Sequence, residues 1–139
     1  MKKLLLHLDT DPVASAFDQA VAYDAGVDNV LSYGGITRDN VTPHVHGVIF
    51  TRGGKNLKNS AIFIGGSNVP ASELVGRAVK KAFFGPVRVS VMLDPNGSNT
   101  TAASIARKVL TDFDITGKNM VILGAGPVGQ RTAMYLLQE

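Results

Sequence analysis

The stretch AIFIGGSNVPASELVGRAVKKAFF, residues 61–84, determines the fold class of this chain. Its apolar start, residues 61–64, predicts a buried strand, and a polar loop follows. Pro70 suits the first turn of a helix, where its missing N–H would have no partner anyway. From there one apolar stripe recurs at helical spacing: Leu74, Val75, Ala78, Val79, Ala82 and Phe83. The stretch is therefore predicted to be one strand followed by one helix.

The same strand–helix unit recurs on both sides of this stretch. Strands are predicted over residues 3–8, 27–33 and 87–93. In the last of these, apolar residues alternate with polar ones, which is typical of a strand near a sheet edge. Four strand–helix units in series predict an α/β fold with an open, mostly parallel sheet and helices on both faces.

Capping residues and glycines mark the predicted helix boundaries. Asp11 is predicted to cap the first helix, with Pro12 at its first position and Gly26 as its stop. A turn over residues 37–41 is followed by a helix from Thr42, because the proline after it is tolerated only near a helix start. The clearest helix carries its apolar residues at regular helical spacing: Ala102, Ile105, Ala106, Val109, Leu110 and Phe113.

The end of the chain has the pattern of an opening dinucleotide-binding unit. A fifth strand is predicted over residues 119–123, followed by GAGPVG (124–129) and a helix from about Pro127. In this motif the first glycine makes a tight turn, the second admits a pyrophosphate to the helix N-terminus, and the third allows close packing. A complete unit needs about 30 residues and an acidic residue about 20 positions on. We therefore expect a first domain over residues 1–114 and the first βα unit of a truncated Rossmann domain over residues 115–139.

Composition and charge are those of a soluble globular protein. The 139 residues are 45% hydrophobic and 18% charged, with a net charge of +3. Arg77, Lys80 and Lys81 lie opposite an apolar stripe, which favours a solvated helix face over a nucleic-acid patch. The absence of cysteine removes disulfides and thiolate catalysis and suits a reducing compartment. We expect a cytoplasmic protein that binds neither nucleic acid nor membrane.

Polar loops follow the predicted strands. Ligands of open parallel sheets bind beyond the carboxyl ends of the strands, which selects the loops 7–12, 33–37, 64–68 and 94–101. Turns and helix caps prefer the same residue types, so a purely structural role stays open for each loop. The fourth loop holds more polar side chains than capping requires: Asp94, Asn96, Ser98, Asn99, Thr100 and Thr101. This surplus of hydrogen-bonding groups suits a polar heterocycle such as a pterin.

Two residue pairs have metal-ligand chemistry without predicting a metal site. Asp9 and Asp11 follow the first strand, but Asp11 is accounted for as a helix cap. His44 and His46 would present both rings on one side only in a strand, because positions i and i+2 of a helix diverge. We predict no metal site.

Four stretches together carry a family resemblance: FDQAVAYDAGVDNVLSYGGIT (17–37), IFTRGGKNLKNSAIFIGG (49–66), VKKAFFGPVRVSVMLDPNGSNTTAA (79–103) and GAGPVGQR (124–131). They resemble the bacterial NAD(P)-dependent methylene-tetrahydromethanopterin dehydrogenases, one-carbon enzymes best known from methylotrophs. The resemblance covers the whole chain in order, and LDPNGSNTTAA and TRGGK are its most specific parts. Pro95 stands where a small polar residue is expected, a change that leaves Asn96 and Thr101 in place.

The resemblance implies a pterin cleft between two α/β domains and hydride transfer from the methylene carbon to NAD or NADP, giving a methenyl cation. It assigns Asn96 and Thr101 to orienting the pterin and Asp9 to the cleft wall. It also implies that the dinucleotide motif lines the cofactor's pyrophosphate, through Gly124, Gly126, Pro127, Val128, Gly129 and Gln130. The catalytic lysine associated with the family would lie beyond residue 139, so no catalytic residue is assigned here.

Two alternatives to an enzyme fragment stay open: a non-catalytic pterin-binding module and an oligomerisation module. The choice between NAD and NADP is not encoded in these residues, and tetrahydromethanopterin is preferred to tetrahydrofolate by resemblance only. The segment from Asn119 onward carries apolar residues that a cofactor domain would normally cover. We expect it to dock onto its own domain or, preferably, onto a second copy, as part of a homo-oligomer.

Overall fold

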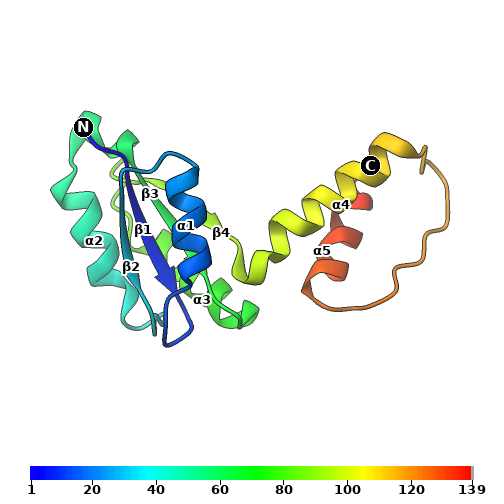
Figure 1. Ribbon diagram of the computed structural model, residues 1–139, viewed down its shortest axis with the longest axis horizontal. Coiled ribbons are helices and arrows are strands. Elements are labelled where there is room, and N and C mark those ends of the chain that lie inside the picture. The colour runs from blue at the N-terminus through cyan, green and yellow to red at the C-terminus, as the bar shows by residue number, and fades with distance from the viewer. Residues whose placement is uncertain (139) are drawn as a thin grey trace. The chain divides into compact units, whose positions relative to one another are not determined.

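A computed structural model describes residues 1–138. The chain forms two compact units, a first unit over Met1–Asn96 and a second unit from Gly97 onward (Figure 1). The predicted domain boundary between residues 114 and 115 stays a prediction, and Glu139 at the end of the predicted second domain lies outside the described residues.

The first unit contains one parallel sheet. Its strands are β1 (Leu4–Asp9), β2 (Asn29–Tyr33), β3 (Ser60–Gly65) and β4 (Ser90–Leu93), in the order β2-β1-β3-β4. All three pairings are parallel, which confirms the predicted α/β fold with an open parallel sheet. β4 lies at an edge, as its alternating pattern predicted.

Helices flank the sheet of the first unit. α1 (Ala16–Asp24) connects β1 to β2, whereas α2 (Val41–Thr51) and α3 (Val69–Lys81) connect strands in the opposite direction across the sheet. Right-handed crossovers therefore place α1 on one face and the packed pair α2 and α3 on the other (Figure 1). The polar loop before β3 contains the short 3₁₀ helix η1 (Gly54–Asn59).

The alternation of β1 divides its residues between two environments. Leu4, Leu6 and Leu8 are buried in the main apolar core. The core also takes side chains from α2, α3 and β3: Val41, Val45, Val48, Ile49, Ile62, Ile64, Val75, Val79 and Ala82. Each of the larger side chains contributes about 1.5–3 kcal/mol when fully buried. His7 and Asp9 point to the opposite face, because side chains of a strand alternate.

The start of α1 differs from the prediction. Its N-cap is Ser15, whose hydroxyl accepts a hydrogen bond from the Asp18 N–H at 3.1 Å. Asp11 caps no helix, because its carboxylate instead accepts two hydrogen bonds from Ser67, one from the backbone N–H at 3.0 Å and one from the side-chain hydroxyl at 2.8 Å. Pro12 consequently lies in a loop. Gly26 follows α1 with a φ of +83°, in agreement with its predicted role as the stop.

The second unit consists of two helices and an irregular connection. α4 (Ser98–Asp112) follows the short 3₁₀ turn η2 (Pro95–Gly97) and packs against α5 (Pro127–Leu136). The strand predicted over residues 119–123 does not form. A strand needs a neighbour for its N–H and C=O groups, and no described strand pairs with this segment.

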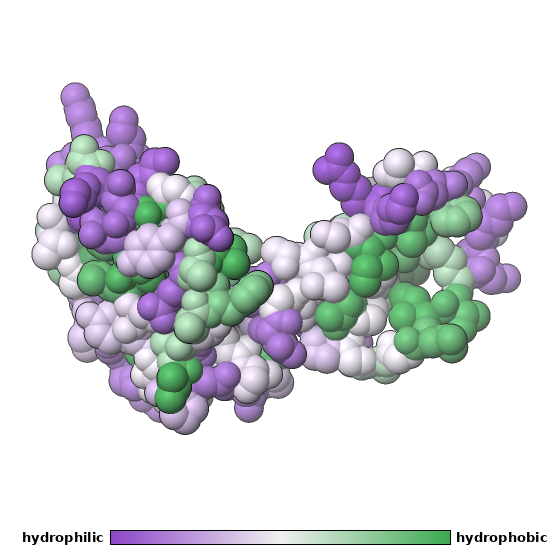
Figure 2. Space-filling model, in the orientation of Figure 1, coloured by the Kyte–Doolittle hydropathy of each residue, from purple (hydrophilic) through white to green (hydrophobic). Residues whose placement is uncertain are grey.

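The predicted docking of the end of the chain holds only in part, because α5 packs against α4 but Met134 and Leu137 are 62% and 84% exposed. Leu136 is buried, whereas Val121 and Leu123 are 85% and 95% exposed. Hydrophobic surface is accordingly visible on this unit in Figure 2. Docking onto a second copy stays a prediction. Among the helices of residues 1–138, none has the length and apolar character needed to cross a membrane.

Candidate functional site

The carboxyl edge of the sheet carries a set of interlocked loops. The N–H of Ile36 donates to the backbone oxygen of Asp9 at 2.9 Å, and that of Gly35 donates to the backbone oxygen of Asp11 at 2.7 Å. These bonds join the loop after β1 to the loop after β2. The Asp11 carboxylate also holds the loop after β3 through Ser67. Three of the four predicted loops are therefore joined by hydrogen bonds.

Two glycines allow this close approach of the loops. A Cβ on Gly66, whose φ is +116°, would lie 1.9 Å from the Thr10 hydroxyl oxygen. A Cβ on Gly34 would lie 2.5 Å from the backbone oxygen of Pro12. Real side chains do not tolerate such distances, so packing requires glycine at both positions. A purely structural role, which the sequence left open for these two loops, therefore explains Gly34 and Gly66.

Asp9 is buried at the end of β1, with 1% of its surface exposed. Its Oδ1 accepts the N–H of Asp11 and its Oδ2 accepts the N–H of Ser15, both at 2.9 Å. The carboxylate thereby fixes both ends of the loop that precedes α1. This contact is with the protein itself, and the predicted place of Asp9 on a pterin cleft wall stays a prediction.

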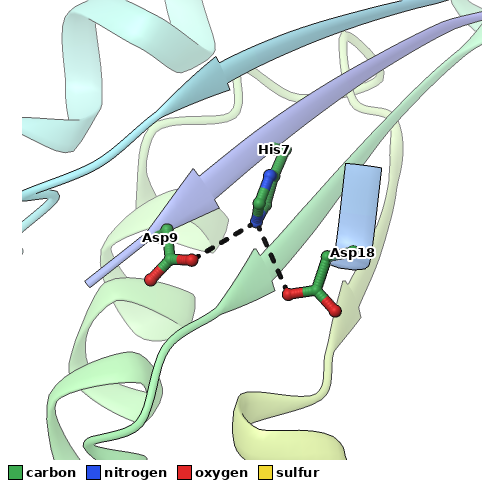
Figure 3. Close-up of side chains that lie close together, drawn as sticks. All are labelled: His7, Asp9 and Asp18. Carbon is green, nitrogen blue, oxygen red and sulfur yellow. Dashed lines mark ion pairs between the residues drawn. The ribbon is translucent and has the colours of Figure 1, made fainter. Parts of the chain in front are cut away.

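His7, which the sequence analysis did not select, lies beside Asp9 (Figure 3). Its Nε2 is 3.6 Å from Asp9 Oδ2 and 3.8 Å from Asp18 Oδ2, and its Nδ1 is 2.9 Å from the Ser32 hydroxyl. Burial lowers the pKa of His7 from its ordinary value, and the charges of Asp9 and Asp18 oppose that effect. Period-two alternation along β1 was the available signal that His7 and Asp9 share a face. Asp18 comes from α1, so only the fold brings it to the pair.

Asn96 and Thr101 follow β4 in the chain. Asn96 is exposed, ends the first unit and has a φ of +53°, which is unusual for a residue other than glycine. Thr101 is exposed in the first turn of α4, in the second unit. Asp94 is buried, and its N–H donates to the backbone oxygen of Ile64 at 3.0 Å. The joint role of Asn96 and Thr101 toward a pterin stays a prediction.

The three motif glycines have the backbone properties that a dinucleotide loop requires. Gly124 has a φ of +104°, and a Cβ on Gly126 would meet no atom within 4 Å. A Cβ on Gly129 would lie 2.2 Å from the Gly124 carbonyl oxygen, so this position needs glycine for packing. α5 begins at Pro127, as predicted. The turn, the open space and the close packing thus fall on the predicted glycines.

The surroundings of this loop suit part of a dinucleotide. The N-cap of α5 is Gly126, which has no side chain to satisfy the N–H groups of the first turn, and such groups favour an anion. Gln130 folds back onto the loop through a 2.7 Å bond from Nε2 to the Ala125 oxygen, and Val128 is half-buried. A cavity of about 650 Å³ adjoins the loop, and mostly apolar residues of α4, α5 and segment 120–124 line it. The loop fits a pyrophosphate, while cofactor binding by these residues stays a prediction.

Comparison with known proteins identifies the family. The family described as methylene-tetrahydromethanopterin dehydrogenase, N-terminal, matches residues 16–96, from the start of α1 to the end of the first unit. The chain belongs to this family. The resemblance inferred from the sequence is therefore confirmed.

Two relatives from Methylorubrum extorquens match most of the chain. The bifunctional protein MdtA is 52% identical over 124 residues, which cover 88% of this chain and 43% of that protein. The NAD(P)-dependent methylenetetrahydromethanopterin dehydrogenase is 36% identical over 137 residues, which cover 92% of this chain and 46% of that protein. A shikimate dehydrogenase (NADP(+)) from Halorubrum lacusprofundi is 37% identical over 68 residues, 48% of this chain. The chain spans a little under half the length of these two Methylorubrum extorquens relatives.

Proposed function

We propose that this chain forms the pterin-side part of an enzyme that transfers a hydride from methylene-tetrahydromethanopterin to NAD(P). Family membership over residues 16–96 is the observation that carries the proposal. The polar loops beyond the carboxyl ends of β1, β3 and β4 support it, because this edge is where open parallel sheets bind ligands. One relative is named for both this substrate and the NAD(P) dependence.

The proposed reaction removes a hydride from the carbon that bridges two pterin nitrogens, leaving a methenyl cation whose charge those nitrogens share. NAD(P), when bound, supplies the hydride acceptor. No proton leaves the carbon, so the protein must align the substrate, stabilise the growing cation and exclude water. In this chain, Asn96 and Thr101 would orient the pterin by hydrogen bonds. Methylene-tetrahydrofolate is the alternative substrate for the same proposed reaction.

The open space at Gly126 and the place of the loop at the N-terminus of α5 support a site for the cofactor's pyrophosphate. These residues would hold and orient the cofactor. The ribose-binding acid expected about 20 residues after the motif has no counterpart in residues 1–138. We therefore propose that the 139-residue chain by itself has no dehydrogenase turnover.

The chain taken alone also fits a second function, a non-catalytic module that binds pterin or mediates oligomerisation. It matches less than half the length of each Methylorubrum extorquens relative, and apolar residues of its second unit are exposed. Both readings expect no turnover from the chain by itself. An absorbance assay with methylene-tetrahydromethanopterin and each nicotinamide cofactor is expected to show no hydride transfer by the chain alone. Turnover within about tenfold of a family enzyme would contradict the proposal that this chain is only one part of the active enzyme.

Pterin binding is tested by calorimetry on the chain with methylene-tetrahydromethanopterin, and with methylene-tetrahydrofolate as competitor. The informative variant is Asn96→Gly, because glycine keeps the +53° φ while removing the side chain. Loss of one orienting hydrogen bond is expected to weaken binding by about one to two decades. Asp39→Asn, a change of an exposed residue outside the four loops, is the control. Wild-type affinity in Asn96→Gly would remove this residue from the proposed site.

A further inference from the structure

The cluster of His7, Asp9 and Asp18 is not explained by the proposed hydride transfer. These three side chains offer one nitrogen and two carboxylate oxygens that all lie within 4.8 Å of one another (Figure 3). We propose that His7, Asp9 and Asp18 bind a divalent first-row transition cation, with Zn²⁺ as the best fit. No step of the proposed hydride transfer involves a metal ion at this site.

The spacing of the three atoms favours an ion over hydrogen bonds. A charge-assisted hydrogen bond from a protonated imidazole would bring nitrogen and oxygen to about 2.7–2.9 Å. The observed separations from His7 Nε2 are 3.6 Å to Asp9 and 3.8 Å to Asp18. Zinc bound at about 2.0–2.2 Å to each ligand sets tetrahedral ligand atoms about 3.4 Å apart. The two gaps from His7 are thus too wide for a charge-assisted hydrogen bond and slightly wider than those around a zinc ion.

The second observation is the orphaned nitrogen of His7. The side chain is 1% exposed, and its Nε2 has no hydrogen-bond partner among residues 1–138. Leaving a buried polar atom unpaired costs about 1–3 kcal/mol. If Nδ1 donates its proton to the Ser32 hydroxyl 2.9 Å away, the lone pair of Nε2 points at the two carboxylates. A cation between them would satisfy the nitrogen and remove that repulsion.

Charge balance also favours a cation. Two carboxylates converge on the site within 4.8 Å of the His7 ring nitrogen. No lysine or arginine in the described part of the chain forms an ion pair with Asp9 or Asp18. A bound divalent cation would neutralise both carboxylates. The imidazole nitrogen selects a zinc-type metal over Mg²⁺ or Ca²⁺, which prefer oxygen ligands only.

Gly65 leaves room at the site. A Cβ at this position would lie 3.2 Å from Asp18 Oδ2 and 3.5 Å from His7 Nε2. The Asp18 side chain is 26% exposed, so an ion can reach the cluster from solvent on the α1 side. A rotation of this partly exposed carboxylate can bring its oxygen to bonding distance. Asp9 keeps its bonds to the loop, because each carboxylate oxygen has two lone pairs.

The test is metal binding to the chelator-treated 139-residue chain. Titration with Zn²⁺ by calorimetry is expected to show one equivalent bound, and Co²⁺ is expected to give the visible absorption bands of a tetrahedral nitrogen–oxygen site. Asp18→Asn is expected to weaken Zn²⁺ binding by more than tenfold, and its partial exposure spares the fold. Ser32→Ala, which removes the partner of His7 Nδ1, is expected to weaken it by about 10–100-fold.

His44→Gln is the matched control, because it removes a histidine outside the cluster. It is expected to leave the affinity unchanged. The proposal is overturned if the wild-type chain binds less than one equivalent, or if Asp18→Asn binds Zn²⁺ as tightly as the wild type. It is equally overturned if His44→Gln abolishes binding, since the ion would then occupy a surface histidine. Circular dichroism of each variant establishes that the fold is retained.

Discussion

Substitution of Asp9 by asparagine tests whether this carboxylate is the anchor of the loop before α1. Asp9 is 1% exposed, and each of its oxygens accepts one backbone N–H at 2.9 Å, from Asp11 and from Ser15. Asparagine has nearly the same shape but only one accepting oxygen, so one N–H must face an NH₂ group. Loss of one hydrogen bond to a charged group is worth about 1.5–3 kcal/mol. We expect Asp9→Asn to lower the free energy of unfolding by that amount.

The measurement is urea unfolding followed by circular dichroism, with a chelator present so that no cation contributes. The control is Asp11→Asn, which makes the same chemical change at a carboxylate whose two hydrogen bonds, both to Ser67, are exposed. The free energy of unfolding of Asp11→Asn is expected to fall by less, about 0.5–1.5 kcal/mol. A loss below about 0.5 kcal/mol for Asp9→Asn, or equal losses in both variants, would refute the anchoring role. The m value should stay constant, because the surface exposed on unfolding does not change.

Two further substitutions test the glycine motif and the buried histidine. Gly129→Ala is expected to destabilise the second unit by about 1–3 kcal/mol, because its Cβ would lie 2.2 Å from a carbonyl oxygen. Gly126→Ala places its Cβ in open space and should destabilise the unit much less. Urea unfolding of the two variants measures the difference. Stability of the chelator-treated chain should fall as pH drops below about 6.5, because burial lowers the pKa of His7 in the folded state and the unfolded chain then binds more protons. In His7→Gln, the thermal midpoint should depend less on pH in this range. An unchanged dependence would show that another group causes the loss of stability.

The sequence by itself determined the features that depend on local pattern. Period-two and helical periodicities predicted the strands and helices of the first unit, because burial of one face imposes those periods on the residues. The motif glycines were also predictable, since a positive φ at Gly124 and the close packing at Gly129 are tolerated well only by glycine. The family followed from specific stretches such as the one around Asn96, and the match over residues 16–96 agrees with it.

Tertiary structure decided whatever depends on a partner distant in the sequence. Asp11 has the chemistry of a helix cap, but it binds Ser67 across the sheet edge, and the cap passes to Ser15. Residues 119–123 have the composition of a strand, yet they form none without a neighbouring strand to take their hydrogen bonds. His7 and Asp18 meet only because α1 folds back over β1. Side-chain chemistry is local, whereas the choice among possible hydrogen-bond partners is made by the packing of distant segments.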